Sequence, residues 1–199
     1  MNIFLDFIQA IDLAIIYPIY NIGGNAILDA AAILLSYIGS FRLGIITVGI
    51  LLMLKKETRQ IAYILFAAAL LSGILVYIIK EITDRPRPFI ELGLAEANLL
   101  IHTNPYRSFP SGHTAAAFTT ASVIAYYFKK WIIPAAIAAC IAGFARIYLL
   151  VHYPSDVIAG AAIGIGVALM IIWIFEKYIS KTNRNEEKTA NADVCKPQK

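Results

Sequence analysis

Five long apolar runs constrain this chain more than any other feature of its sequence. They lie at about residues 29–54, 60–80, 113–128, 131–150 and 157–175. A helix that crosses the hydrocarbon core of a bilayer needs about 20 mostly apolar residues. With 59% hydrophobic and only 15% charged residues, the chain is too apolar for an ordinary soluble domain. The sequence therefore predicts an all-α, polytopic transmembrane helix bundle of about five spans, forming one membrane-embedded domain over residues 1–180.

The two ends of the chain differ from these runs. Residues 1–20 carry Asp6 and Asp12, and Pro18 with the following glycines closes the segment. Two acidic residues in so short a run favour a helix in the membrane interface, with a sixth span as the alternative. Residues 181–199 are polar and have no apolar periodicity, so we expect a disordered tail.

Basic residues follow a pattern that predicts orientation. They gather at residues 55–59, at residues 129–130 and after the fifth run, at 177–188. By the positive-inside rule these three clusters, and with them the C-terminus, are cytoplasmic in a cell membrane. The loops at about 83–112 and 151–156 then lie on the extracytoplasmic side. Because the basic residues are dispersed among apolar helices, the net charge of +4 does not indicate a nucleic acid partner.

One further charge, Arg42, lies within the first apolar run beside a Gly-Ser pair. A charged side chain inside a membrane span indicates either a functional site or a charge paired within the bundle. Both interpretations stay open at this stage.

The first cluster of chemically suggestive residues is the segment 80–88, where Lys80, Arg85 and Arg87 end an apolar run and two prolines prevent further helix. Arginine can grip two oxygens of a phosphate in a planar fork, and lysine adds a compact positive charge. Such a mixture suits a tetrahedral oxyanion. The alternative is that these side chains only reach for the membrane surface.

The second cluster is the quartet Pro110, Ser111, Gly112 and His113, placed directly before an apolar run with the proline at a plausible first helical position. The first amides of a helix have no partner within it and bind anions, and glycine allows close approach of the backbone. His113 can transfer a proton near neutral pH. Taken alone, the quartet could also be a simple helix cap.

The third cluster runs from Arg146 to Asp156. His152 and Asp156 are four residues apart across a helix start, so the carboxylate can reach one imidazole nitrogen and aim the other at a substrate. His102 has no such neighbours, and we interpret it as an interfacial histidine. The two cysteines, Cys140 and Cys195, show neither a disulfide pattern nor metal-ligand spacing.

Together the three segments resemble the signature of the type 2 phosphatidic acid phosphatase superfamily. That signature reads Lys-x6-Arg-Pro, Pro-Ser-Gly-His and Ser-Arg-x5-His-x3-Asp, and it is matched here from Lys80 to Asp156 in order and spacing. One position departs from it, since Ala145 stands where the family has serine. The hydrogen bond that this hydroxyl gives to phosphate would be lost or replaced.

The resemblance implies a mechanism without metal or other cofactor. His152 would attack phosphorus and form a phosphohistidine, Asp156 would orient the imidazole, and His113 would protonate the leaving oxygen. The phosphate oxygens would be held by Lys80, Arg87, Arg146 and the amides of Ser111 and Gly112. The substrate would be a lipid phosphate in the bilayer, with its head group at the site and its tail in lipid.

The resemblance also suggests which lipid. Our preferred substrate is a polyprenyl diphosphate such as undecaprenyl diphosphate, and the nearest rival is phosphatidylglycerophosphate or phosphatidate. A lipid phosphotransferase and a small lipid transporter are the other interpretations. The sequence does not predict an oligomeric state.

Overall fold

The computed structural model describes residues 3–38, 41–94, 100–101 and 103–194, of which 3–5, 37–38, 41–43 and 179–194 are described by their backbone only. In these ranges the chain is helical and has no strand, which confirms the all-α prediction. The α-helices are α1 (Ile3–Ile22), α2 (Ala26–Ile38), α3 (Phe41–Met53), α4 (Arg59–Thr83), α5 (Pro88–Glu91), α6 (Gly112–Tyr127), α7 (Ile132–Tyr148) and α8 (Pro154–Val194).

Among the described residues, three stretches are long and apolar enough to cross a membrane, within Lys56–Glu91, Lys129–Tyr148 and Pro154–Tyr178. Large apolar side chains such as those of Leu70, Ile133 and Trp173 face outward and are more than three fifths exposed, as expected where lipid is the solvent. The predicted transmembrane bundle is thus confirmed.

The run at 29–54, predicted to be one span, is instead two shorter apolar helices, α2 and α3. Gly39 and Ser40, which separate them in the sequence, lie outside the described residues. The side chain of Arg42 also lies outside the described part, so its role stays a prediction.

Helix α6 is the centre of the bundle and packs against α3, α4, α7 and α8. Its closest partner is α8, because the glycines of α8 let two backbones touch. A Cβ atom at Gly160 would stand 2.4 Å from the carbonyl oxygen of Ser111, and one at Gly164 would stand 2.3 Å from that of Ala115. Small residues four apart allow this approach between helices in membranes. The contact brings the first turns of α6 and α8 together.

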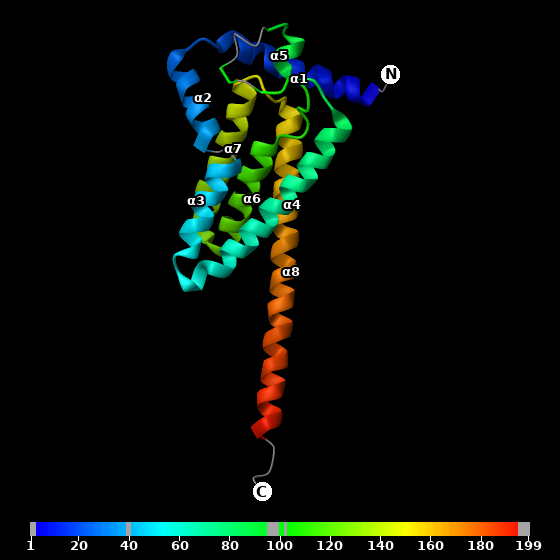
Figure 1. Cartoon of the computed structure of the whole chain (residues 1–199). Helices are drawn as coiled ribbons and strands as arrows, with labels where there is room; N and C mark the ends of the chain where they lie inside the picture. The colour runs from blue at the N-terminus through cyan, green and yellow to red at the C-terminus, as the bar shows by residue number, and fades with distance from the viewer. Residues whose placement is uncertain (1–2, 39–40, 95–99, 102, 195–199) are drawn as a thin grey trace.

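Helix α1 lies across one end of the bundle rather than along it, as Figure 1 shows. It continues through Pro18 and ends at Ile22, directly before the glycines that were expected to close the segment. Helix α5 lies at the same end. The turns after α3 and after α6, which carry the basic residues at 55–59 and 129–130, lie at the other end (Figure 1).

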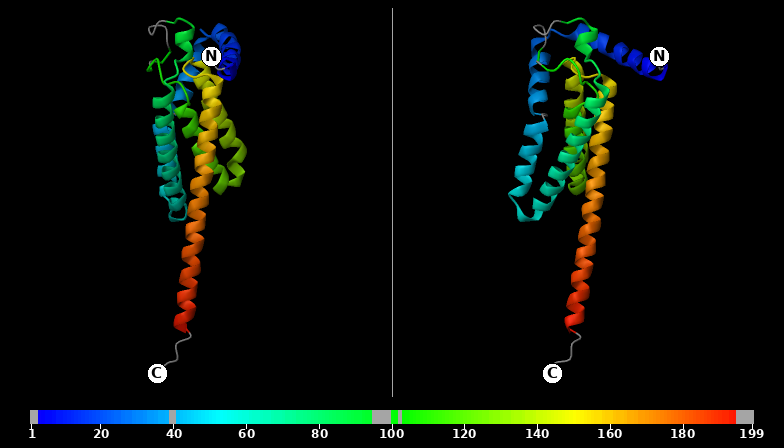
Figure 2. Two further views of the ribbon diagram at one scale, coloured as in Figure 1. Left: turned by 90° about the vertical axis from the view of Figure 1, so that its right-hand side faces the viewer. Right: turned by 45° about the vertical axis from the view of Figure 1, so that its right-hand side comes forward.

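Helix α8 extends well beyond the other helices in every view of Figures 1 and 2. Its backbone is helical through Val194, where the sequence analysis expected a disordered tail over 181–199. The physical reason is that no glycine or proline occurs between Gly166 and Pro197, so nothing in the sequence stops the helix. Residues 195–199 lie outside the described residues.

Candidate active site

The three sequence segments meet at the end of the bundle that α1 and α5 cover. Lys80 lies in the last turn of α4, Arg146 in the last turn of α7 and Asp156 in the first turn of α8. Contacts and charge interactions link seven of the predicted site residues into one cluster, with Gly112 between two of them in the sequence: Lys80, Arg87, Ser111, His113, Arg146, His152 and Asp156. The sequence therefore identified residues that the fold brings together.

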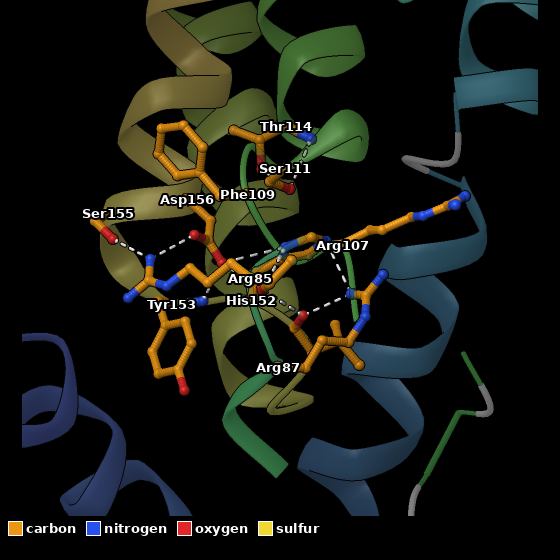
Figure 3. Close-up of polar contacts among 12 residues, drawn as sticks. Arg85, Arg87, Arg107, Phe109, Ser111, Thr114, His152, Tyr153, Ser155 and Asp156 are labelled. Atoms are coloured by element: carbon orange, nitrogen blue, oxygen red, sulfur yellow. Dashed lines mark hydrogen bonds and ion pairs between the residues drawn. The ribbon is translucent and has the colours of Figure 1, made fainter. Parts of the chain in front are cut away.

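His152 stands at the centre of this cluster and is only 2% exposed. Its Nδ1 atom lies 3.5 Å from Oδ2 of Asp156, and its Nε2 atom lies 3.3 Å from Nη1 of Arg87 (Figure 3). A guanidinium can only donate hydrogen bonds. Nε2 is therefore the unprotonated nitrogen, and the Nδ1 proton points toward the carboxylate.

Burial is the main cause that lowers the pKa of His152 well below its ordinary value, although Asp156 opposes the shift. The imidazole is accordingly neutral at neutral pH. A neutral histidine whose unprotonated Nε2 lies beside a buried cation is arranged as a nucleophile toward an anion.

The carboxylate of Asp156 is completely buried and held on both oxygens. Oδ2 accepts hydrogen bonds from the Ser108 hydroxyl at 2.5 Å and from the Tyr153 amide at 2.9 Å, and Oδ1 accepts one from Arg85 at 2.7 Å. The sequence had singled out Arg85 as one of the three cations of the first cluster, although the motif does not fix it. Ser108 was not predicted, and its place just before the second motif was the only signal.

Arg87 is buried and fixed by backbone carbonyls. Its Nε atom donates to the carbonyl of Asn104 and its Nη1 atom to that of Val151, both at 2.6 Å. At the edge of the cluster, Lys80 donates to the carbonyl of Ser108 at 3.2 Å and to that of Arg107. Backbone carbonyls carry no full charge, so both cations keep their positive charge available for an anion.

Arg146 is 4% exposed and donates from Nη1 to the hydroxyl of Ser36 on α2. Its Nε atom is buried and has no hydrogen-bond partner among the described residues. A buried donor without a partner is costly and calls for an explanation, and an anion in the site would supply one. Ser36 was not predicted from the sequence, because nothing in its surroundings distinguishes it from other serines in apolar helices.

The start of α6 differs in two ways from the prediction. The helix begins at Gly112 with Ser111 as its N-cap, so Pro110 precedes the cap and is not the first helical residue. The amide of Ser111 donates to the carbonyl of Asp156 at 3.0 Å and is not free to bind phosphate. The Ser111 hydroxyl accepts from Thr114, which closes the cap. Ser111 thus joins the two helix starts, and the first free amides are those of Gly112 and His113.

The remaining basic residues take other positions. Arg107 forms an exposed ion pair with Glu81 at 2.8 Å, and its side chain extends away from His152 in Figure 3. His102 lies outside the described residues. Ala145, where the family has serine, is buried and lines an apolar cavity of about 220 Å³ between α1, α2 and α7. A group of three or more potential metal ligands is absent from the described parts of the chain.

Fold and site together define a polytopic membrane protein that carries a histidine–aspartate pair among buried cations at one end of its helices. The family model of the PAP2 superfamily matches residues 61–180, which include every predicted site residue. The chain belongs to the PAP2 superfamily.

Known proteins that are similar to this chain are named for different lipid substrates. A lipid A 1-phosphatase of Rhizobium johnstonii is 29% identical over 62% of this chain and 52% of its own length. An undecaprenyl-diphosphatase of Sulfolobus acidocaldarius is 29% identical over 80% of this chain and 76% of its own length. The crystal structure of a PAP2 type phosphatidylglycerolphosphate phosphatase from Bacillus subtilis is 25% identical, covers 85% of this chain and 86% of its own, and has a TM-score of 0.71. Several curated relatives are matched over only 52–61% of their own length.

Proposed function

We propose that this protein is a membrane lipid phosphatase that hydrolyses a polyprenyl diphosphate, such as undecaprenyl diphosphate, to the monophosphate and phosphate. The observation that carries this proposal is the setting of His152, whose Nδ1 atom faces Asp156 while Nε2 faces the buried cation Arg87. A nucleophile that is oriented on one side and faces an anion site on the other is what attack on phosphorus requires.

In the proposed reaction the Nε2 lone pair of His152 attacks the terminal phosphorus, and the bond from phosphorus to the bridging oxygen breaks. His113 gives a proton to that leaving oxygen, which departs with the lipid monophosphate. Asp156 stabilises the positive charge that develops on the imidazole. Water then attacks the phosphohistidine and passes a proton to His113, which releases phosphate and restores both histidines.

Three cations and two amides would stabilise the charge on the transferred group. Lys80, Arg87 and Arg146 would hold its oxygens together with the amides of Gly112 and His113 at the start of α6. Ser111 does not donate its amide in this scheme, because that amide binds the carbonyl of Asp156. The unpartnered Nε atom of Arg146 supports a phosphate position next to α7.

The orientation of the protein is part of the proposal. We propose that the site faces the extracytoplasmic side of the cell membrane and that the C-terminus is cytoplasmic. The charge distribution supports this, because the basic clusters at 55–59 and 129–130 lie at the end of the bundle opposite the site. Cysteine labelling from outside intact cells tests it: Tyr106→Cys in the loop before α6 should react, and Lys56→Cys should not.

The finer part of the proposal is the identity of the lipid substrate. Similarity to an undecaprenyl-diphosphatase over 80% of this chain supports the polyprenyl diphosphate as a candidate. The structural similarity to a phosphatidylglycerolphosphate phosphatase makes that glycerolipid the second candidate.

The experiment is a comparison of kcat/KM for undecaprenyl diphosphate, phosphatidylglycerophosphate, phosphatidate and lipid A 1-phosphate, using detergent-purified protein. We expect the polyprenyl diphosphate to give the highest value. A strong preference for a glycerolipid or for lipid A would overturn this choice of substrate while leaving the phosphatase mechanism intact. A lipid alcohol added as acceptor distinguishes hydrolysis from phosphotransfer, because a phosphotransferase would phosphorylate the alcohol.

A further inference from the structure

The N-terminal helix α1 carries a buried acidic residue that the sequence motifs do not explain. Asp12 is 1% exposed, although it belongs to a helix that lies across the end of the bundle. It also lies outside residues 61–180, which the family model matches. A buried carboxylate is costly unless charged or polar groups surround it. The partners of Asp12 therefore indicate why it is there.

Those partners connect α1 directly to the candidate active site. Oδ2 of Asp12 lies 2.7 Å from Nη2 of Arg85, and Nη1 of the same arginine lies 2.7 Å from Oδ1 of Asp156. One guanidinium thus bridges the buried carboxylates of α1 and α8. Gln9, one turn earlier on α1, accepts a further hydrogen bond from Nη2 at 2.5 Å. The Arg85 side chain also stacks on the ring of Tyr153, 4.0 Å from its centre (Figure 3).

Asp12 also holds the first turn of α8. Its Oδ1 atom accepts a hydrogen bond from the Ser155 amide at 2.9 Å, and its Oδ2 atom accepts one from the Ser155 hydroxyl at 2.5 Å. Ser155 directly precedes Asp156 and donates an amide that has no partner within its own helix. Asp12 on α1 therefore caps the N-terminus of α8, as an acidic N-cap residue would.

The bridge has an electrostatic consequence for the reaction. An arginine that paired with Asp156 alone would direct its whole charge at the carboxylate that must stabilise the imidazolium of His152. Asp12 supplies a second negative charge to the same guanidinium, so less of the Asp156 charge is neutralised. At the same time Asp12 fixes the helix turn that aims Oδ2 of Asp156 at His152.

We propose that Asp12 is a positioning residue for the phosphatase reaction, acting on Asp156 through the charge of Arg85. The proposal rests on the proposed function, since it assigns Asp12 a role in the attack by His152. It means that the interfacial helix α1 is part of the catalytic apparatus, in addition to the helices that carry the family motifs.

The test uses Asp12→Asn in the full-length, detergent-purified protein, with Asp6→Asn as the matched control. The introduced asparagine has the same shape as the aspartate but no charge, whereas Asp6 is an exposed acid on the same helix. We expect Asp12→Asn to lower kcat about tenfold or more and to change KM by less than about threefold, because the lost interaction matters in the transition state. The control should match the unsubstituted protein. An unchanged kcat, or a raised KM alone, would overturn the proposal.

A double-mutant cycle then tests the route through Arg85. If Asp12 acts through this arginine, adding Asp12→Asn to Arg85→Gln should lower kcat by less than about twofold. A loss of the same size with and without Arg85 would contradict the proposal. The double variant removes both partners of the Asp12–Arg85 pair, so it can fold even where Asp12→Asn does not. In that case equal kcat values for Arg85→Gln and the double variant support the proposal, and a further tenfold loss overturns it.

The two proposals fail in different ways. If the unsubstituted protein releases no phosphate from any lipid, or if His152→Ala is fully active, the proposed function is wrong. If the unsubstituted protein is active and depends on His152 while Asp12→Asn behaves like Asp6→Asn, only the role of Asp12 is wrong.

Discussion

Replacing Gly160 with alanine should separate the two helix starts that form the site. The added Cβ atom would stand 2.4 Å from the Ser111 carbonyl oxygen, and ordinary contact begins at 3.4 Å, so the backbones must move apart by about 1 Å. The Ser111 amide donates a hydrogen bond to the carbonyl of Asp156, and a movement of this size strains that hydrogen bond. A misplacement of about 1 Å can cost about 100-fold in rate, and overpacking costs about 1–3 kcal/mol of stability. We therefore expect kcat for phosphate release to fall about 100-fold.

The assay is phosphate release from the preferred lipid, measured beside the thermal unfolding of each purified variant. Gly166→Ala is the matched control, because it adds the same methyl group to the same helix where no atom lies within 4 Å. The control should keep its activity. If Gly160→Ala kept more than about a third of the kcat of the unsubstituted protein, close contact of α6 and α8 would not be what positions the site.

The other predictions concern the carboxylate, the imidazole and metal dependence. Ser108→Ala removes a hydrogen bond to the charged Asp156. Such bonds contribute about 1.5–3 kcal/mol, so kcat should fall about tenfold or more. An unchanged kcat would show that the reaction does not need Ser108. Because burial lowers the pKa of His152, its neutral, nucleophilic form persists as pH falls through 6.5, so the loss of kcat/KM on the acid side should be centred below pH 6.5. An acid-side loss centred at or above pH 6.5 would contradict this. Activity should be unchanged after treatment with EDTA, and a loss that added metal restores would refute the metal-independent mechanism.

The helical membrane fold could be predicted from the long apolar runs, whereas the limits of the individual helices could not. The spacing of His152 and Asp156 and the signature match identified groups that the fold does bring together. A motif can be found in this way because the chemistry restricts which residue types can stand at each position. The helix limits depend on weaker preferences, so the continuation of α8 was missed.

The supporting residues could not be predicted from the sequence, because their partners are distant along the chain. Asp12 binds Arg85 across 73 positions and Ser36 binds Arg146 across 110. No local pattern encodes such pairs, since they depend on how α1 and α2 pack against the other helices. The Ser111 amide shows the same limit, because its partner is a carbonyl of α8 and not an anion.

The most direct test of the account is to look for the phosphoryl group on His152 itself. The purified protein would be mixed with a stoichiometric amount of lipid diphosphate and stopped in alkali, where phosphohistidine survives, and its peptides would be analysed by mass spectrometry. We predict a phosphoryl group on His152 that appears and decays within a single turnover and is absent from His152→Ala, which should release no phosphate. Phosphate release by His152→Ala at the rate of the unsubstituted protein would contradict the account.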